Sequence, residues 1–249
     1  MSGHSKWSTI KHKKGAADAK RGKLFSKLSR SIMVAAKEGG ADPATNIALA
    51  NAIEKARSYS MPKDNIERAI AKGVGEGTDG SSYETVIYEG YGPEGVAVLV
   101  EALTDNRNRT ASEVRHAFAN SGGALGATGA VAWQFERRGV VVVPAAGVDE
   151  EELFMAAADA GADDVRRTDD GWEIVCAAKE FAPVRKAIAD AGLKIERSEL
   201  TMLPQTTVPL DAGGARPVLR LMDAIEELED VQEVYTNFDV PDEVLAEVS

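Results

Sequence analysis

Residues 140–202 decide the fold, and they read VVVVPAAGVDEEELFMAAADAGADDVRRTDDGWEIVCAAKEFAPVRKAIADAGLKIERSELTM. Segments rich in β-branched residues alternate here with segments whose apolar residues recur at the spacing of a helix. The expected elements are strands at 140–143, 164–167, 172–177 and 194–201 and helices at 150–160 and 181–191. Their order, β-α-β-β-α-β, is that of a ferredoxin-like domain. The stretch therefore predicts an α+β sandwich spanning residues 139–204.

The flanking sequence predicts a second sandwich, into which the first is inserted. Its expected elements are again four strands and two helices, namely strands 83–91, 96–104 and 130–135, helix 111–120, helix 217–229 and strand 233–237. Thr110 and Glu113 have the spacing of a capping box, which predicts that helix 111–120 begins after Thr110. The helices of each sandwich should cover one face of an antiparallel sheet. This discontinuous domain is expected to comprise residues 83–138 and 205–249.

Residues 21–72 predict a bundle of three helices with short connections. The first helix, at 21–37, has a single apolar face at 3.6-residue spacing. Asp42 and Pro43 would supply the N-cap and the first-turn proline of the second helix. The third helix is expected to open at Met61, which is followed by a proline.

Two further segments lack helical or strand periodicity. Residues 1–20 are rich in Lys, Ser and Gly, and we expect a basic, flexible arm there. Residues 73–82 are rich in Gly and Ser and are expected to form a linker. The predicted fold class is thus multidomain α and α+β, with an N-terminal three-helix bundle and two ferredoxin-like α+β sandwich domains, one inserted in the other.

The charge is divided unevenly along the 249 residues. The whole chain has a net charge of −11, which by itself argues against nucleic acid as a partner. Residues 1–72, however, hold 15 Lys/Arg against 6 Asp/Glu and carry +9, so the remaining residues carry −20. Such asymmetry is typical of a basic module that binds a polyanion, beside an acidic remainder that faces away from it.

The basic residues of the arm and of the first helix are therefore the main candidate nucleic-acid contacts. Exposed Lys and Arg side chains neutralise phosphates, and a tryptophan can stack on an unpaired base. On the first helix the basic residues lie opposite the apolar face, although an ordinary solvated lysine face would have the same pattern. The candidates are Lys6, Trp7, Lys11, His12, Lys13, Lys14, Lys20, Arg21, Lys23, Lys27, Arg30 and Lys37.

Two loops are candidate phosphate or partner contacts. Residues 105–110 join an expected strand to the start of a helix, where free N–H groups and two arginines could hold a phosphate. The alternative is a polar loop whose arginines pair with neighbouring carboxylates. The second loop is at 61–65. The candidate residues are Lys63, Asn65, Arg107, Asn108, Arg109 and Thr110.

Enzymatic chemistry has little support in the sequence. His4, His12 and His116 lack a Cys, Asp or Glu at metal-ligand spacing, so no metal site and no cofactor are expected. The single cysteine, Cys176, lies in an apolar strand, which is typical of a buried and inert thiol. No run of about 18 apolar residues exists, which argues against a membrane span. The N-terminus lacks the apolar stretch of a secretory signal, so a cytoplasmic, non-enzymatic protein is expected.

Several longer motifs resemble those of the YebC/PmpR family, which includes the mitochondrial translational activator of cytochrome c oxidase. They are Gly3–Lys14 (GHSKWSTIKHKK), Lys23–Lys27 (KLFSK), Met61–Asn65 (MPKDN), Gly90–Val96 (GYGPEGV) and Thr104–Thr110 (TDNRNRT). The likeness extends over essentially the whole chain. It implies a helical domain followed by two α+β domains, which agrees with the pattern of the residues.

The resemblance implies one of two functions. Bacterial members of the family are described as probable transcriptional regulators that bind DNA. Other members associate with ribosomes and relieve stalls at proline-rich stretches. The expected partner is accordingly a nucleic acid, either DNA or ribosomal RNA. A basic arm suits both, and the two alternatives stay open at this level.

Overall fold

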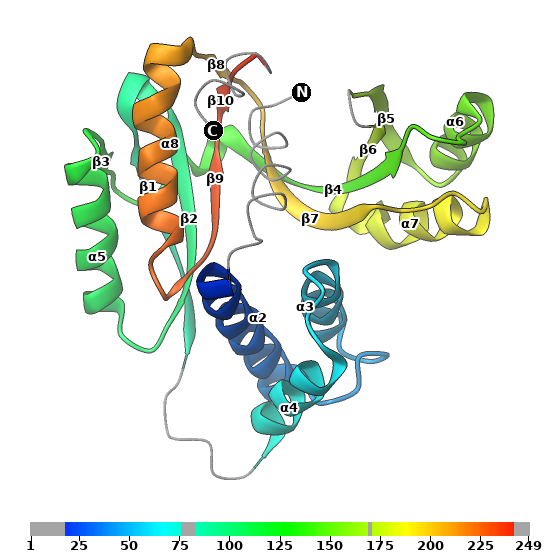
Figure 1. The fold of residues 1–249 in the computed structure, drawn as a ribbon, viewed down its shortest axis with the longest axis horizontal. Helices are drawn as coiled ribbons and strands as arrows, with labels where there is room; N and C mark the ends of the chain where they lie inside the picture. Colours follow the sequence, from blue (N-terminus) through cyan, green and yellow to red (C-terminus); the bar gives the residue numbers. More distant parts are fainter. Residues whose placement is uncertain (1–17, 76–82, 169–170, 242–249) are drawn as a thin grey trace. The chain divides into compact units, whose positions relative to one another are not determined.

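The computed structural model describes residues 18–75, 83–168 and 171–241 (Figure 1). The chain forms two compact units. One consists of Phe135–Leu203, and the other is built from the chain before and after that insertion. Among the described residues, no helix is both long and apolar enough to cross a membrane.

The N-terminal part is a bundle of three helices, α2 (Asp18–Gly39), α3 (Ile47–Ser58) and α4 (Lys63–Val74). Each helix directs an apolar face inward, as the 3.6-residue spacing requires. The core consists of buried residues from all three helices, among them Leu28, Ile32, Leu49, Ile53 and Ile66. The three expected helices are therefore present.

The start of α3 differs from the expectation. Its N-cap is Asn46, whose Oδ1 accepts the N–H of Leu49 at 3.0 Å. The side-chain amide of Asn46 also donates to the carbonyls of Ala35 and Gly40, so this buried residue ties the end of α2 to the start of α3. Asp42 instead accepts from Ala44 in the preceding turn, and the predicted cap at Asp42 is wrong. Asn46 is the better cap because it satisfies three backbone groups at once.

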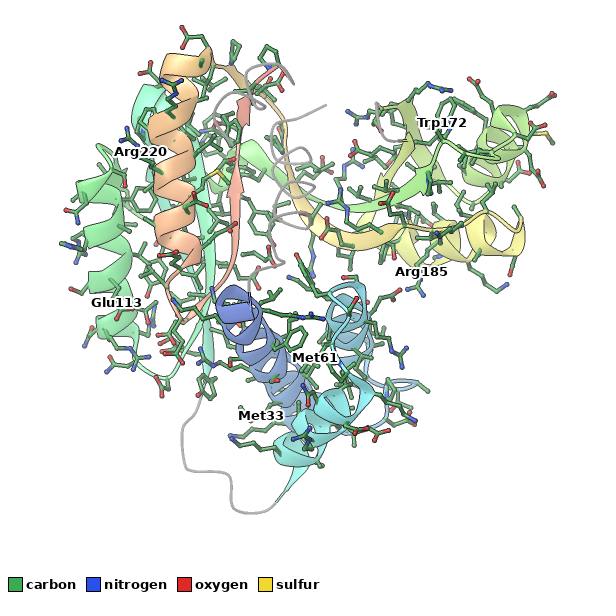
Figure 2. The ribbon with its side chains drawn as sticks, viewed as in Figure 1. Met33, Met61, Glu113, Trp172, Arg185 and Arg220 are labelled. Carbon is green, nitrogen blue, oxygen red and sulfur yellow. The ribbon has the colours of Figure 1, made fainter. Side chains whose placement is uncertain are left out.

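Helix α4 extends into the predicted linker. Gly73 belongs to α4 and is buried against α2, where a Cβ atom would lie 2.3 Å from the carbonyl oxygen of Met33. Met33 lies on α2, the helix on which α4 packs (Figure 2). This glycine serves close helix packing rather than chain freedom. Likewise α2 begins at Asp18, inside the segment expected to be an arm, and residues 76–82 lie outside the described ranges.

The discontinuous domain is an α+β sandwich with a four-stranded sheet of order β3-β1-β2-β9. Neighbouring strands are antiparallel. Helices α5 and α8 pack together on one face of it (Figure 1), and their apolar residues share a core with β2 and β9. The elements are β1 (Glu84–Tyr91), β2 (Ala97–Thr104), α5 (Arg107–Asn120), β3 (Ala124–Leu125), β8 (Val208–Pro209), α8 (Ala212–Glu226), β9 (Val231–Thr236) and β10 (Phe238–Asp239).

Three details of this domain correct the sequence expectations. Helix α5 is capped by Asn106 rather than by Thr110, which is buried inside the helix. The strand expected at 130–135 is wrong for residues 130–134: Ala132–Gln134 is a 3₁₀ turn, β4 begins only at Phe135, and the short β3 pairs with β1 instead. Helix α8 starts five residues before Pro217, where Asp211 accepts the N–H of Gly214 and caps it.

The inserted unit has the expected ferredoxin-like order. Its sheet runs β5-β6-β4-β7, and Val141 of β4 lies opposite Ile174 of β6. Trp172, labelled in Figure 2, packs edge-on against Phe154 at 5.7 Å between ring centroids. The elements are β4 (Phe135–Pro144), α6 (Glu150–Asp159), β5 (Ala162–Arg167), β6 (Gly171–Ala177), α7 (Phe181–Asp190) and β7 (Arg197–Pro204).

Hydrogen bonds fix the two ends of the insertion. Glu196 donates to the carbonyl of Val142, which joins the start of β7 to the end of β4. Immediately outside the insertion, the N–H of Gln205 donates to the carbonyl of Gln134 at 2.8 Å. The buried Gln134 side chain also accepts from Asn237, so the point of insertion is anchored to the chain that follows β9.

Candidate nucleic-acid interface

The basic arm falls outside the residues that the structure describes. This applies to Lys6, Trp7, Lys11, His12, Lys13 and Lys14, whose roles stay predictions. Lys20 belongs to the first turn of α2, by its position in the sequence. The geometry of the candidate interface therefore begins at Arg21.

Part of the α2 face is open to solvent. Arg21, Lys23 and Lys37 are exposed, and the Arg21 guanidinium lies 5.4 Å from the centre of the Phe25 ring. Lys23 and Lys37 have no acidic partner among residues 18–75, 83–168 and 171–241. These two lysines can therefore meet a phosphate without breaking an ion pair of the described chain.

Lys27 and Arg30 differ from the other candidates because they contact the chain's own acidic residues. The Lys27 ammonium donates to the carbonyl of Glu226, the last residue of α8, at 2.6 Å. Arg30 pairs through one nitrogen with Glu229 at 2.8 Å and through the other with Asp230 at 3.1 Å. Only 12% of the Arg30 side chain is exposed. The predicted basic stripe is thus divided into open cations and occupied ones.

These partners form a compact acidic feature, which we call the acidic corner. It spans residues 226–233, from the last residue of α8 into β9, and contains Glu226, Glu227, Glu229, Asp230 and Glu233. Two further contacts reach it from the bundle: Lys55 pairs with Glu233, and the Ser31 hydroxyl donates to Gln232 at 2.8 Å. The bundle and the corner are joined by ion pairs and hydrogen bonds, while their apolar cores are separate clusters.

Asp230 is the centre of the acidic corner. Its Oδ2 accepts from the hydroxyls of Thr104 and Thr110 and from Arg109 at 2.6 Å, and its side chain is only 4% exposed. Burial acts to raise the pKa of Asp230, but the hydrogen bonds from Arg109, Thr110 and Thr104 outweigh it, so the pKa is lowered. The group therefore stays ionised, and its Oδ1 faces Arg30.

The candidate loop at 105–110 is mostly committed to internal contacts. Arg109 pairs with Asp105 and with Asp230, and these bonds raise its pKa. For this residue the structure agrees with the alternative expectation, in which the arginines pair with neighbouring carboxylates. Thr110 is buried. Arg107 and Asn108 remain exposed, with Arg107 3.7 Å from the Glu84 carboxylate. Of the candidate residues of this loop, Arg109 is partly exposed but paired, so Arg107 and Asn108 are the more accessible to a partner.

The loop at 61–65 is similarly engaged. The Lys63 side chain is 83% exposed and lies 3.4 Å from Glu67, four residues along α4. Asn65 accepts from Arg68 at 2.6 Å. Such exposed pairs on one helix are weak, so a phosphate could compete for Lys63.

A buried carboxylate organises a loop that the sequence did not reveal. Glu89 accepts the N–H groups of Gly129, Val131 and Ala132 at 2.7–2.8 Å. Burial acts to raise the pKa of Glu89, but these three hydrogen bonds prevail and lower it. A single carboxylate therefore joins three backbone N–H groups of the stretch before β4.

Two exposed aromatic rings lie at this loop, Trp133 from the 3₁₀ turn before β4 and Tyr91 from the end of β1, and we call them the aromatic surface. Trp133 is 68% exposed, and its indole N–H donates to the carbonyl of Ala130 at 3.2 Å. Tyr91 is 40% exposed and donates to the same carbonyl at 3.0 Å. The strand expected at 130–135 concealed this arrangement, and the available signal was a tryptophan directly after a Gly/Ala-rich loop.

Metal and thiol chemistry find no site in the described part of the chain. No three His, Cys, Asp or Glu side chains gather there as metal ligands. His116 contacts Asn120 on the same helix. Cys176 is fully buried, and its burial, together with nearby Asp163, raises the pKa of its thiol to about 11. This thiol is inert at neutral pH.

Comparisons with known proteins extend over the whole chain. Residues 5–76 match the TACO1/YebC protein N-terminal domain, and residues 83–238 match the TACO1/YebC second and third domain. A protein of Rubrobacter xylanophilus is 58% identical over the full length of both chains, and one of Thermobifida fusca is 52% identical over the same extent. Both are named probable transcriptional regulatory protein.

A solved structure agrees with these matches. The crystal structure of a conserved hypothetical protein from Aquifex aeolicus superposes with a TM-score of 0.81 at 50% identity. The match covers 93% of this chain and 96% of that one. Motifs, domain matches and fold lead to the same assignment, and the chain belongs to the TACO1/YebC family.

Proposed function

We propose that this chain is a cytoplasmic, non-enzymatic regulator of gene expression that binds nucleic acid, in the first place DNA in transcription. The observation that carries the proposal is the concentration of positive charge in the N-terminal part, +9 over residues 1–72. Exposed Lys23 and Lys37 of α2 continue that charge onto the folded bundle. The names of the relatives from Rubrobacter and Thermobifida support a role in transcription.

The proposed contacts act mainly through the phosphate backbone. Lysine side chains neutralise phosphates and release counterions, which gives affinity without choosing a sequence. The remaining residues carry −20 and repel the same polyanion. The binding mode is therefore directional, with the bundle and arm toward the nucleic acid.

A ribosome-associated role in translation, relieving stalls at proline-rich stretches, is the second candidate. The aromatic surface favours it, because Trp133 and Tyr91 are exposed and anchored on one carbonyl. Aromatic rings of this kind stack on unpaired bases, which loops of ribosomal RNA offer and duplex DNA does not. Crosslinking in cells, followed by sequencing of the bound nucleic acid, decides between promoter DNA and ribosomal RNA.

A charge-reversal experiment tests the phosphate contacts. In Lys23→Glu/Lys37→Glu, two contacts are lost, so the slope of log K against log salt for a duplex should shrink by about 1.8. The matched control is Lys179→Glu, an 82%-exposed lysine of the inserted unit. For a comparison at equal change of charge, Lys179→Glu is set against the single variants Lys23→Glu and Lys37→Glu. If Lys179→Glu loses as much affinity as either of them, the phosphate contact is not localised on α2.

A further inference from the structure

We propose that the acidic corner is an intramolecular competitor for the polyanion. In the closed arrangement it occupies Lys27 and Arg30, and a bound nucleic acid displaces it and takes over both cations. The inference rests on the proposed function and adds a mode of regulation to the same site.

The contacts of the corner are the kind that a phosphate makes. Lys27 meets the carbonyl of Glu226 at the C-terminus of α8, where a helix carries partial negative charge. Arg30 directs its two terminal nitrogens at two carboxylates, those of Glu229 and Asp230. The guanidinium fork fits phosphate oxygens in the same two-pronged manner. The corner therefore imitates an anionic ligand with atoms of the protein itself.

The corner can release Arg30 without leaving a buried charge unpaired. Asp230 keeps three hydrogen bonds on its Oδ2, from Thr104, Thr110 and Arg109, when Arg30 leaves its Oδ1. Glu229 is already 80% exposed and needs no partner to remain solvated. Loss of this contact is therefore inexpensive, unlike the breaking of most buried ion pairs.

The closed contact is also imperfectly satisfied. The side-chain nitrogen of Gln232 is buried without a hydrogen-bond partner, although the oxygen of the same amide accepts from Ser31. A buried donor without a partner costs free energy, which opening would recover through hydration. The apolar cores of the bundle and of the sandwich are separate clusters. Separation of the corner from α2 therefore exposes neither core to water.

Opening would lengthen the row of cations on α2. Lys23, Lys27 and Arg30 are spaced four and three residues apart and so share one face of the helix. They span about 10 Å along the helix axis, which matches the rise of about three nucleotides in one strand of a duplex. In the closed arrangement only Lys23 of this row is open. Release of the corner thus turns one phosphate contact into three.

Two Glu→Gln variants, matched in their change of net charge, test the competition. Glu229→Gln removes a carboxylate that contacts Arg30, and Glu227→Gln removes an exposed carboxylate two residues away that lies outside these contacts. Both change the net charge equally. We expect Glu229→Gln to bind a 30-base-pair duplex about two to five times more tightly at 150 mM salt and Glu227→Gln to match the parent. Equal affinities for the two variants would overturn the proposal.

A reversible tether provides the second test. Ser31→Cys/Gln232→Cys places one thiol on each side of this contact, and the buried Cys176 does not compete. A short bifunctional methanethiosulfonate reagent joins the two thiols through reducible disulfide bonds. With the tether formed, Lys27 and Arg30 stay occupied, so the salt slope should be smaller by about 1.8 than after reduction. An unchanged slope overturns the competition alone. If the untethered protein binds neither duplex DNA nor RNA at 50 mM salt, the proposed function itself fails.

Discussion

Replacing Glu89 by glutamine tests how the aromatic surface is held. The glutamate carboxylate accepts three backbone N–H groups, from Gly129 on one oxygen and from Val131 and Ala132 on the other. Glu89→Gln keeps the size of the side chain but offers one carbonyl oxygen and one NH₂ group. The carbonyl can retain two of the three donors, and the NH₂ group then faces the N–H of the third.

The cost follows from these three bonds. One backbone N–H loses its acceptor, which costs about 1–3 kcal/mol, and the two remaining bonds weaken from charge-assisted to neutral. We expect a local loss of about 2–4 kcal/mol, so the amides of residues 129–132 should exchange with solvent about 30- to 700-fold faster. Hydrogen exchange read by mass spectrometry measures this directly.

The control lies on the same strand. Glu84 is about half exposed at the start of β1, so Glu84→Gln should change the exchange of residues 129–132 by less than about 0.5 kcal/mol. If Glu89→Gln and Glu84→Gln protect residues 129–132 equally well, the carboxylate does not hold the loop and the reasoning is refuted.

The lowered pKa of Glu89 adds a pH dependence of known sign. The ionised group stabilises the folded loop above its unfolded pKa of about 4.3, and this contribution is lost as the pH falls through the lower folded value. The parent should therefore lose protection of residues 129–132 below about pH 4.3. Glu89→Gln should lack that component.

Three further changes follow from the packing and the exposed surface. Asp230→Ala leaves a threonine pair and an arginine without their shared acceptor and should cost about 3–5 kcal/mol in urea unfolding, and a cost below about 1 kcal/mol would contradict its central role. Gly73→Ala should lower the Tm, by the equivalent of about 1–3 kcal/mol, because its Cβ meets a carbonyl of α2, whereas Gly22→Ala, in open space on α2, should raise it slightly. Trp133→Ala should leave the Tm nearly unchanged while weakening the binding of single-stranded RNA by about 1–3 kcal/mol per stacked base, as measured by fluorescence anisotropy.

Much of the architecture follows from periodicity in the sequence. The structure confirms the inserted β-α-β-β-α-β unit. This unit was predictable because each of its helices and strands has its own apolar periodicity, and Gly, Asp and Pro mark its turns. Caps are harder to predict, because Asp42 and Asn46 are equally good by local chemistry. Asn46 is used because its amide also reaches Ala35 and Gly40, a contact that no local pattern contains.

The sequence predicts which basic residues belong to the candidate site, but not which of them are free of contacts within the protein. A helical wheel places Lys23, Lys27 and Arg30 on one face, and that inference is sound for an isolated helix. Only the tertiary structure shows that residues about 200 positions later supply a backbone carbonyl for Lys27 and a carboxylate for Arg30. Trp133 was missed for the opposite reason, since the turn that exposes it depends on the distant Glu89.

The hydrogen bond between Gln205 and Gln134 joins the two segments of the host unit on either side of the insertion. While the inserted unit is folded, the pairing of β7 with β4 already brings these two ends together. If that unit melts, the host must close a loop of about 70 residues, an entropic penalty of about 4 kcal/mol. A lesion confined to the insertion should therefore lower the stability of the surrounding sandwich through the chain alone. The insertion thus holds residues 134 and 205 together without being needed for the host core. A short linker between these two residues should replace it with little loss of stability of the host sandwich.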